Sequence, residues 1–441
     1  MRSGKHGWGG ATLRLWAIAV AGLALLPANA ARAGGLLLYE VGTADVGLAS
    51  AGYSARAQDA STVLTNPAGM TRLPGTQILL GAQALYGDYG FSRGAGTDPL
   101  LGGNHGGNPI GWFPGGGFFL THRLSPEVAL GLAVTGNFGL AVKYDADWVG
   151  RYYGQQGTLL GLSLLPSVAW KVNDKLSLGA SLNAMYGGFK QKVAINNVGF
   201  GRPDGQLEMD DRTWGFGVNL GLLYEIDPAT RLGLTWNSQV NLDFSAQPSF
   251  SGVSPGLALL LAARGLDRAN IDVGIKVPQG VLASVFHQVD ERWAVLGSIG
   301  WQQWSKFGDL ELGISDNRNP GSLTANLDFK DTWHVAVGGQ YRVSQPWLLN
   351  FGVAYDSAFQ DNPIASPLLP ANSAWRFGVG FQNEVDRSFS WGAAAEYVYG
   401  GTIDLARQAR IPLALGGRGN LDGSYDNAGI FFLSANFNWK F

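Results

Sequence analysis

Residues 214–226 read WGFGVNLGLLYEI, and this stretch decides the fold. Every second residue in it is large and apolar: Trp214, Phe216, Val218, Leu220, Leu222, Tyr224 and Ile226. The residues between them are small or polar, except for Leu223. Because side chains along a β-strand point alternately to opposite faces, the pattern predicts a long strand with one continuous hydrocarbon face.

The same alternation recurs later in the chain. Residues 231–244 place Leu232, Leu234, Trp236, Val240, Leu242 and Phe244 on one predicted face. The last residues repeat it with Phe431, Leu433, Ala435, Phe437, Trp439 and Phe441. A soluble β-sandwich also alternates, but aromatic residues gather at these strand ends, as expected for the two girdles of a membrane barrel.

Connections between the predicted strands alternate in length. Short turns are expected at 125–127, 173–175, 227–229, 290–291, 344–346 and 386–387, and long polar or glycine-rich loops at 91–113, 196–211, 308–328 and 404–426. Bacterial outer-membrane barrels have short periplasmic turns and long external loops. The sequence therefore predicts an all-β fold, an antiparallel transmembrane barrel of about 14 strands spanning residues 75–441.

Composition excludes several classes of protein. Charged residues make up 15% of the 441, and the formal net charge is −2, which gives no basic surface for nucleic acid. The absence of cysteine excludes disulfides and thiolate metal sites. After the first 33 residues there is no run of 18 apolar residues, which argues against a bundle of membrane helices.

The first 33 residues resemble a secretory signal peptide. Arg2, Lys5 and Arg14 precede an apolar segment at 15–26 that is too short to span a bilayer. Two Ala-x-Ala sites follow it, so cleavage is expected after Ala33, with cleavage after Ala30 as the alternative. We expect this signal to direct the chain out of the cytoplasm.

Residues 34–74 have neither a strand nor a helix period, and they are mostly small or polar. Within them the sequence Asn66-Pro67-Ala68-Gly69 signals a sharp turn, because proline fixes φ and glycine tolerates positive φ. Such a segment needs walls around it, so we interpret it as a plug, or hatch, in the barrel lumen. A surface loop is the alternative for the turn taken alone.

Several stretches resemble the FadL/TodX-type outer-membrane transporters of long-chain fatty acids and other hydrophobic compounds. The resemblance lies in residues 59–63 with 66–73, in residues 214–227, and in Phe138-Gly139-Leu140 with Trp148, Gly150, Arg151 and Tyr152. It implies a barrel with an N-terminal hatch. It also implies a lateral opening in the third strand, which we place at Gly136, Asn137, Phe138 and Gly139; strand fraying is the alternative.

Two regions are candidates for an external binding groove. Ser254 and Pro255 begin a predicted short helix that carries Leu257, Leu260 and Leu261 and stops at Gly265. An apolar helix in an external loop either packs on a neighbour or receives a ligand. The loop that carries Trp148 and Tyr152 is the expected partner for a shared groove.

Two cations are candidates for binding a carboxylate. The strand phase places Lys330 and Arg376 on the lumen side, although pairing with barrel acids such as Glu225 or Asp243 is the alternative. The resemblance favours Lys330, because the family offers a lysine at the corresponding strand. Lys190 falls on the outward phase and is not a candidate.

Catalysis is not indicated by the sequence. None of the five histidines stands at metal-ligand spacing or beside a nucleophile motif, so we expect no enzyme activity, no metal and no cofactor. The predicted function is passive uptake of hydrophobic molecules, first of all long-chain fatty acids, across the bacterial outer membrane. Aromatic hydrocarbon uptake, a general polar-solute porin and a lipid-hydrolysing barrel are the alternatives.

The expected partners follow from this function. They are a hydrophobic small molecule, outer-membrane lipid and, during biogenesis, the barrel-assembly machinery, for which the aromatic Phe441 at the chain end resembles a recognition signal. We expect a monomer.

Overall fold

The computed structural model describes residues 38–197, 201–263, 265, 267–315, 321–361 and 365–441. The predicted signal peptide and its two cleavage sites lie outside the described residues. Among these residues, no helix combines the length and apolar character needed to cross a membrane.

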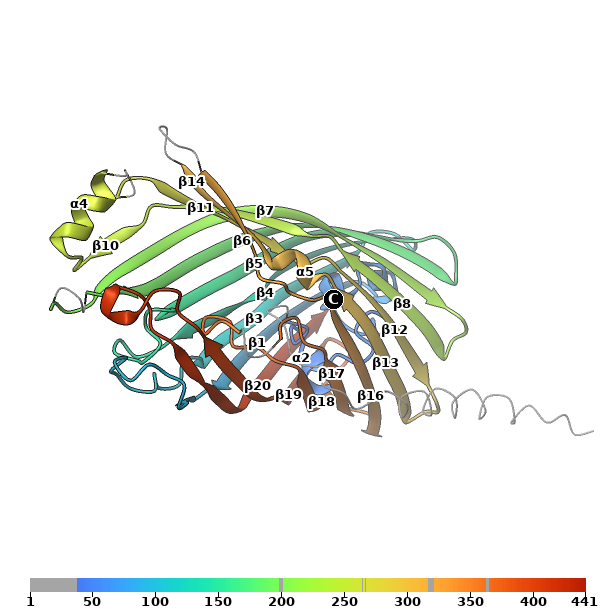
Figure 1. Ribbon diagram of the computed structural model, residues 1–441. Helices are drawn as coiled ribbons and strands as arrows, with labels where there is room; N and C mark the ends of the chain where they lie inside the picture. Colours follow the sequence, from blue (N-terminus) through green and yellow to red (C-terminus); the bar gives the residue numbers. More distant parts are fainter. Residues whose placement is uncertain (1–37, 198–200, 264, 266, 316–320, 362–364) are drawn as a thin grey trace, which may run out of the picture. The chain divides into compact units, whose positions relative to one another are not determined.

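Fourteen antiparallel strands of the described chain form a closed barrel, because β1 pairs with both β3 and β20 (Figure 1). The predicted number of strands is confirmed. In order around the wall they are β1 (Thr76–Asp88), β3 (Gly111–Arg123), β4 (Val128–Lys143), β5 (Gln156–Lys171), β6 (Leu176–Ile195), β7 (Gly205–Glu225), β8 (Thr230–Asn237), β12 (Gly280–Gln288), β13 (Trp293–Gln302), β16 (Thr332–Ser344), β17 (Trp347–Asp356), β18 (Ala374–Glu384), β19 (Phe389–Arg407) and β20 (Leu421–Lys440).

The outward face of the wall carries the predicted hydrocarbon. Trp214, Phe216 and Leu220 of β7 are exposed, as are Phe431 and Leu433 of β20. Their neighbours point inward, which leaves polar side chains and glycines facing the lumen. Five of the six short turns are closed by a backbone hydrogen bond, such as Asp227 N to the Thr230 carbonyl oxygen at 3.4 Å, and at the sixth Ser344 pairs with Trp347.

A smaller sheet covers one region of the lumen. It contains β9 (Val240–Ala246), β11 (Asn270–Val277), β14 (Asp309–Ser315) and β15 (Gly321–Asn326) in the order β15-β14-β11-β9. Alongside it lie β10 (Ser249–Ser251), which pairs with β7, and the helices α4 (Pro255–Ala263) and α5 (Trp304–Phe307). Nearer the start of the chain, β2 (Phe91–Arg93) pairs with β20, and η3 (Leu413–Leu415) precedes β20.

The predicted single strand at 231–244 is wrong in its second half. The chain leaves the wall after Asn237, and Val240, Leu242 and Phe244 of β9 are buried against inner residues instead of facing lipid. Val240 and Leu242 fill the space in front of Gly215 of β7. Alternation shows which residues share a face, but an inner sheet and a lipid-facing wall satisfy it equally.

Candidate functional site

The N-terminal segment from Leu38 to Pro74 occupies the lumen as a hatch. It contains α2 (Thr43–Gly47), α3 (Thr62–Thr65) and η1 (Pro67–Arg72), and nearly all of its side chains are buried. The wall makes room for it with glycines. A Cβ on Gly352 would lie 1.8 Å from the carbonyl oxygen of Leu48, and one on Gly233 would lie 1.9 Å from that of Ser54. Only glycine permits this approach of two backbones.

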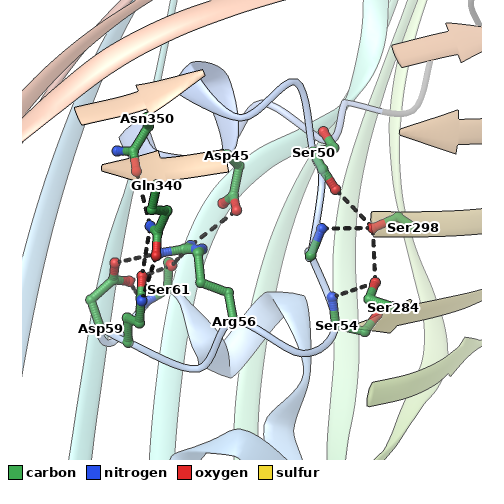
Figure 2. Close-up of polar contacts among 12 residues, drawn as sticks. Asp45, Ser50, Ser54, Arg56, Asp59, Ser61, Ser284, Ser298, Gln340 and Asn350 are labelled. Atoms are coloured by element: carbon green, nitrogen blue, oxygen red, sulfur yellow. Dashed lines mark hydrogen bonds and ion pairs between the residues drawn. The ribbon is translucent and has the colours of Figure 1, made fainter. Parts of the chain in front are cut away.

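A ladder of hydroxyl groups joins the hatch to the wall on one side (Figure 2). Gly52 N donates to Ser298 Oγ at 2.9 Å, and Ser54 N donates to Ser284 Oγ at 3.1 Å. The Ser298 hydroxyl lies 3.0 Å from the carbonyl oxygen of Ser50 and donates to it. These bonds satisfy hatch backbone groups that lack helix or sheet partners.

An ion-paired arginine holds the interior of the hatch together. Arg56 donates to Asp45 and to Asp59, each at 3.0 Å, and to Ser61 Oγ at 3.3 Å (Figure 2). Burial raises the pKa of Asp45 to about 6 against the opposing attraction of Arg56. Burial acts in the same direction on Asp59, but Arg56 and the bonds from Ser61 outweigh it and lower the pKa of that carboxyl.

The predicted turn at residues 66–69 anchors the hatch to β7. Asn66 caps η1, because its Oδ1 accepts from Ala68 N at 3.1 Å. Its Nδ2 donates to the carbonyl oxygens of Ser54 at 2.7 Å and of Leu222 at 3.0 Å. Pro67 is the first residue of η1, and Ala68 and Gly69 are buried behind it. One side chain thus ties two parts of the hatch to one wall strand.

Arg376 of β18 lies in the lumen, but it is already surrounded by carboxylates. Its guanidinium pairs with Glu40 of the hatch, with Asp356 of β17 and, at 3.2 Å, with Glu396 of β19. Asp356 also bonds His334 Nδ1 at 2.7 Å. Of the acids expected to pair with lumen cations, Glu225 pairs with Arg72 of the hatch.

Lys330 does not lie within a wall strand, because β16 begins at Thr332. Its ammonium is exposed and donates to Asp361 at 2.6 and 2.8 Å. The preceding Phe329 has the phase of the outward residues of the strand that follows, which predicts a lipid-facing side chain. It instead packs on the inner rings of Phe307 and Phe359. Lys190, by contrast, pairs with Glu208 on the neighbouring strand.

The wall has a window between β3 and β4. The two strands pair from Arg123 opposite Ala129 up to Gly117 opposite Thr135, and β4 then continues beside β5 alone. A bulge at Asn137 lies where β4 separates from β3. The end of β4 meets the segment before β3 again where Lys143 N donates to the Pro109 carbonyl oxygen at 2.7 Å. The residues predicted for the lateral opening lie along this window.

An apolar cavity of about 450 Å³ lies behind the window, and we call it the gap pocket. Its walls come from β1, β3, β4, β5 and β20 and include Leu85, Phe113, Gly136, Phe138, Leu160 and Phe432. The first described residue, Leu38, also lines it. Leu38 N donates to the Asn137 carbonyl oxygen at 3.0 Å, so the start of the hatch is bound to the bulge.

The residues predicted for an external groove are separated between two packed regions. Trp148 and Tyr152 are fully buried in a loop cluster, where the Trp148 ring stacks on Tyr144 with centroids 3.9 Å apart. Leu257 and Leu261 of α4 are partly buried, and Leu260 belongs to the same helix, which Ser254 caps through a 3.3 Å bond to Leu257 N. A cavity near both regions is lined by Arg151 and Gly252, but not by Trp148, Tyr152, Leu257 or Leu261.

Within the described residues, no group of three or more His, Asp or Glu side chains is arranged to hold a metal ion. His334 is buried, and its Nδ1 bonds an oxygen of Asp356 rather than a serine hydroxyl.

A family model described as outer membrane protein transport protein (OMPP1/FadL/TodX) matches residues 24–441. This chain belongs to that family. A long-chain fatty acid transport protein of Escherichia coli O6:H1 is 26% identical over 455 residues, which covers 96% of this chain and 98% of that protein. Outer membrane protein P1 of Haemophilus influenzae is 25% identical, covering 80% of this chain and 83% of that protein.

Solved structures show the same fold as this FadL-family chain. The crystal structure of a Pseudomonas aeruginosa FadL homologue aligns with a TM-score of 0.80 at 22% identity, covering 92% of this chain and all of that one. The Pseudomonas putida toluene transporter TodX aligns with a TM-score of 0.66 at 15% identity, covering 92% and 98%. The chain is an outer-membrane transport protein.

Proposed function

We propose that this protein carries hydrophobic molecules, foremost long-chain fatty acids, by passive diffusion from the external side into the gap pocket and out through the wall. The observation that supports it best is the window itself. Strand pairing between β3 and β4 stops at Thr135, and the space behind it is the gap pocket, walled by Leu85, Phe113 and Phe138. A cargo in that pocket is separated from the bilayer by side chains alone.

The energetics favour a lateral route over a water-filled one. Transfer from water to an apolar site stabilises a hydrocarbon by about 0.8 kcal/mol per CH₂, or roughly 12 kcal/mol for a sixteen-carbon tail. Release of such a tail into periplasmic water would cost that whole transfer free energy. Passage from an apolar pocket into the bilayer exchanges two similar environments, and it needs no other energy source.

The names of the relatives support the choice of fatty acids. The proteins that are 26% identical over most of this chain are named long-chain fatty acid transport proteins. Aromatic hydrocarbons are a second candidate, because the residues that line the gap pocket carry no charge that a toluene-like molecule would leave unpaired.

Uptake by cells tests the proposal. Cells whose own hydrophobic-compound channel has been removed should take up labelled palmitate and toluene faster when they carry this protein. The Gly136→Trp variant, which fills the window, should abolish the gain. A gain limited to small polar solutes, with large ion conductance, would instead identify a general porin.

A further inference from the structure

A second, smaller cavity lies next to the gap pocket, at the start of the hatch. It has a volume of about 70 Å³, and Leu38 lines both cavities. Asn137, Asn183, Asn219, Asn237, Thr235 and Gln302 line it together with apolar side chains, so we call it the amide pocket. A space of this size holds two or three water-sized groups, enough for a polar head but not for a long tail.

The described residues that line the two cavities carry no charged side chain. In the part of the chain that the structure describes, the linings of the gap pocket and of the amide pocket contain no Asp, Glu, Lys, Arg or His. Tyr39 and Tyr53 are the ionisable residues that line the amide pocket, and burial raises the pKa values of both hydroxyls, so they remain neutral. The two cavities therefore offer apolar contact and neutral hydrogen bonds.

The amide pocket also contains a polar atom without a partner. Asn183 of β6 is only 7% exposed, and its Oδ1 bonds to no group among the described residues. A buried carbonyl oxygen in this state favours a ligand that donates a hydrogen bond to it. An alcohol or a protonated carboxylic acid carries such an O–H group, whereas an ionised carboxylate only accepts.

The two cations that the sequence predicts to bind a carboxylate, Arg376 and Lys330, are already paired with acids. Tyr39 separates the amide pocket from the cluster around Arg376, since its ring lies 4.5 Å from that of His334. Arg376 is paired there with three carboxylates, those of Glu40, Asp356 and Glu396. Such a cluster attracts no further anion. Lys330 is paired with Asp361 and lines neither cavity.

We propose that cargo occupies this site as an uncharged molecule, with its tail in the gap pocket and an O–H donor bound to Asn183 in the amide pocket. The ligand class is long-chain alcohols and carboxylic acids in their protonated form. This inference rests on the proposed function and specifies its cargo. An ionised carboxylate would lose its hydration here without gaining a counterion, which is strongly unfavourable.

Equilibrium binding to the full mature chain in lipid nanodiscs tests the proposal, with empty nanodiscs subtracted. The probes are radiolabelled palmitate and cetyl alcohol, measured at about pH 5 and about pH 8, above the ordinary carboxyl pKa of about 4. We expect palmitate to bind about a thousandfold more weakly at the higher pH, because its protonated fraction falls about tenfold per pH unit over these three units. Cetyl alcohol should bind equally at both.

Variants of Asn183 test the role of the amide pocket. Asn183→Leu should weaken cetyl alcohol binding about fivefold, the size expected for one lost hydrogen bond. Asn183→Lys supplies the missing cation, and it should strengthen palmitate binding at about pH 8 by about tenfold or more. Asn436→Leu is the matched control, since Asn436 is also a buried wall residue with an unpartnered Oδ1 but lines neither cavity.

Migration of unboiled protein on a gel confirms that each variant barrel has folded. Palmitate binding at about pH 8 that equals cetyl alcohol binding and does not respond to Asn183→Lys would overturn this inference while leaving the proposed function intact. If neither probe binds the wild-type protein above empty nanodiscs, the proposed function and the inference both fail.

Discussion

The backbone N–H of Leu38 donates a 3.0 Å hydrogen bond to the carbonyl oxygen of Asn137, the residue that bulges out of β4 beside the window. The side chain of Asn137 is held separately, because its Oδ1 accepts from Ser163 Oγ at 2.9 Å. Leu38 lines both the gap pocket and the amide pocket. We therefore expect movement of this residue to join the two cavities while the wall keeps its strand pairing.

A disulfide between positions 38 and 137 tests whether that movement is needed. The chain contains no cysteine, so Leu38→Cys with Asn137→Cys gives a defined pair. We expect oxidation to lower uptake by about tenfold, an increase of about 1.4 kcal/mol in the barrier, and reduction to restore it.

A second tether distinguishes local movement from movement of the whole hatch. The hydroxyls of Thr43 and Ser434 lie 2.7 Å apart, between α2 and β20. Oxidised Thr43→Cys with Ser434→Cys should leave uptake unchanged. Loss of uptake with this pair would show that the entire hatch must shift.

Filling the window should close the exit. A Cβ on Gly136 would meet no atom within 4 Å, so Gly136→Trp adds its ring to open space. We expect uptake to fall by about tenfold or more, because only about 1.4 kcal/mol of added barrier is needed. Gly188→Trp is the control, since Gly188 of β6 is equally open and lines neither cavity; equal loss in both variants would argue against a lateral exit.

Removal of the Asn66 side chain should loosen the hatch while the barrel still assembles. Asn66→Ala removes the side-chain bonds to Ala68 N and to the carbonyl oxygens of Ser54 and Leu222. We expect the hatch to lose about 2–4 kcal/mol of stability, measured as faster hydrogen exchange at residues 54–68, and uptake to fall. Pro67→Ala should have a smaller effect in the same direction. Unchanged uptake in both would contradict a role for this turn.

Replacement of a wall glycine that contacts the hatch should destabilise the hatch. Gly352→Ala places a methyl group 1.8 Å from the Leu48 carbonyl oxygen. The clash is with backbone, so a change of side-chain rotamer cannot relieve it and the hatch backbone itself must move. We expect a loss of about 1–3 kcal/mol, seen as protease cleavage within residues 38–73. Gly188→Ala should leave cleavage unchanged.

The two acids that flank Arg56 should respond oppositely to pH. Asp59 has a lowered pKa, so its contribution to stability is present above its unfolded value of 3.8 and is lost as pH falls through its lower folded value. Asp45 has a pKa raised from 3.8 to about 6, so its contribution is present below the lower value and is lost as pH rises through the higher one.

Replacement of each acid by its amide tests this assignment. At about pH 8, Asp59→Asn should destabilise the hatch by about 3 kcal/mol, the lower end for breaking a buried pair. Asp45→Asn should be neutral or stabilising at that pH. Urea midpoints of hatch unfolding, followed by hydrogen exchange, measure both; a larger loss for Asp45→Asn would reverse the assignment.

The barrel could be predicted from sequence because its determinants are local. Alternation in residues 214–226 and the short turns depend on neighbours in the chain, and the structure has them as expected. Val240 was misplaced for a physical reason, because period-2 patterning carries no information about which medium a face meets. The same limit applies to Phe329, three residues before its strand begins.

The candidate site was harder to predict because it depends on residues far apart in the chain. Glycines at 136 and 139 gave a local signal for the bulge. No local signal shows that Arg376 meets Glu40, or that Asn183 faces a cavity shared with Leu38, because these contacts join segments that only barrel closure brings together.

The point where the chain leaves the wall has a consequence for how such proteins diversify. Asn237 at the end of β8 and Gly280 at the start of β12 are paired neighbours, although 42 positions separate them along the chain between Ser238 and Gln279. The segment 238–279 therefore leaves and rejoins the barrel wall at a single pair of neighbouring residues. Val240 and Val277 near its two ends line the amide pocket, but the part between them can change by insertion, deletion or grafting while the barrel strands keep their register. The outer cover can therefore be remodelled for new cargo without rebuilding the wall.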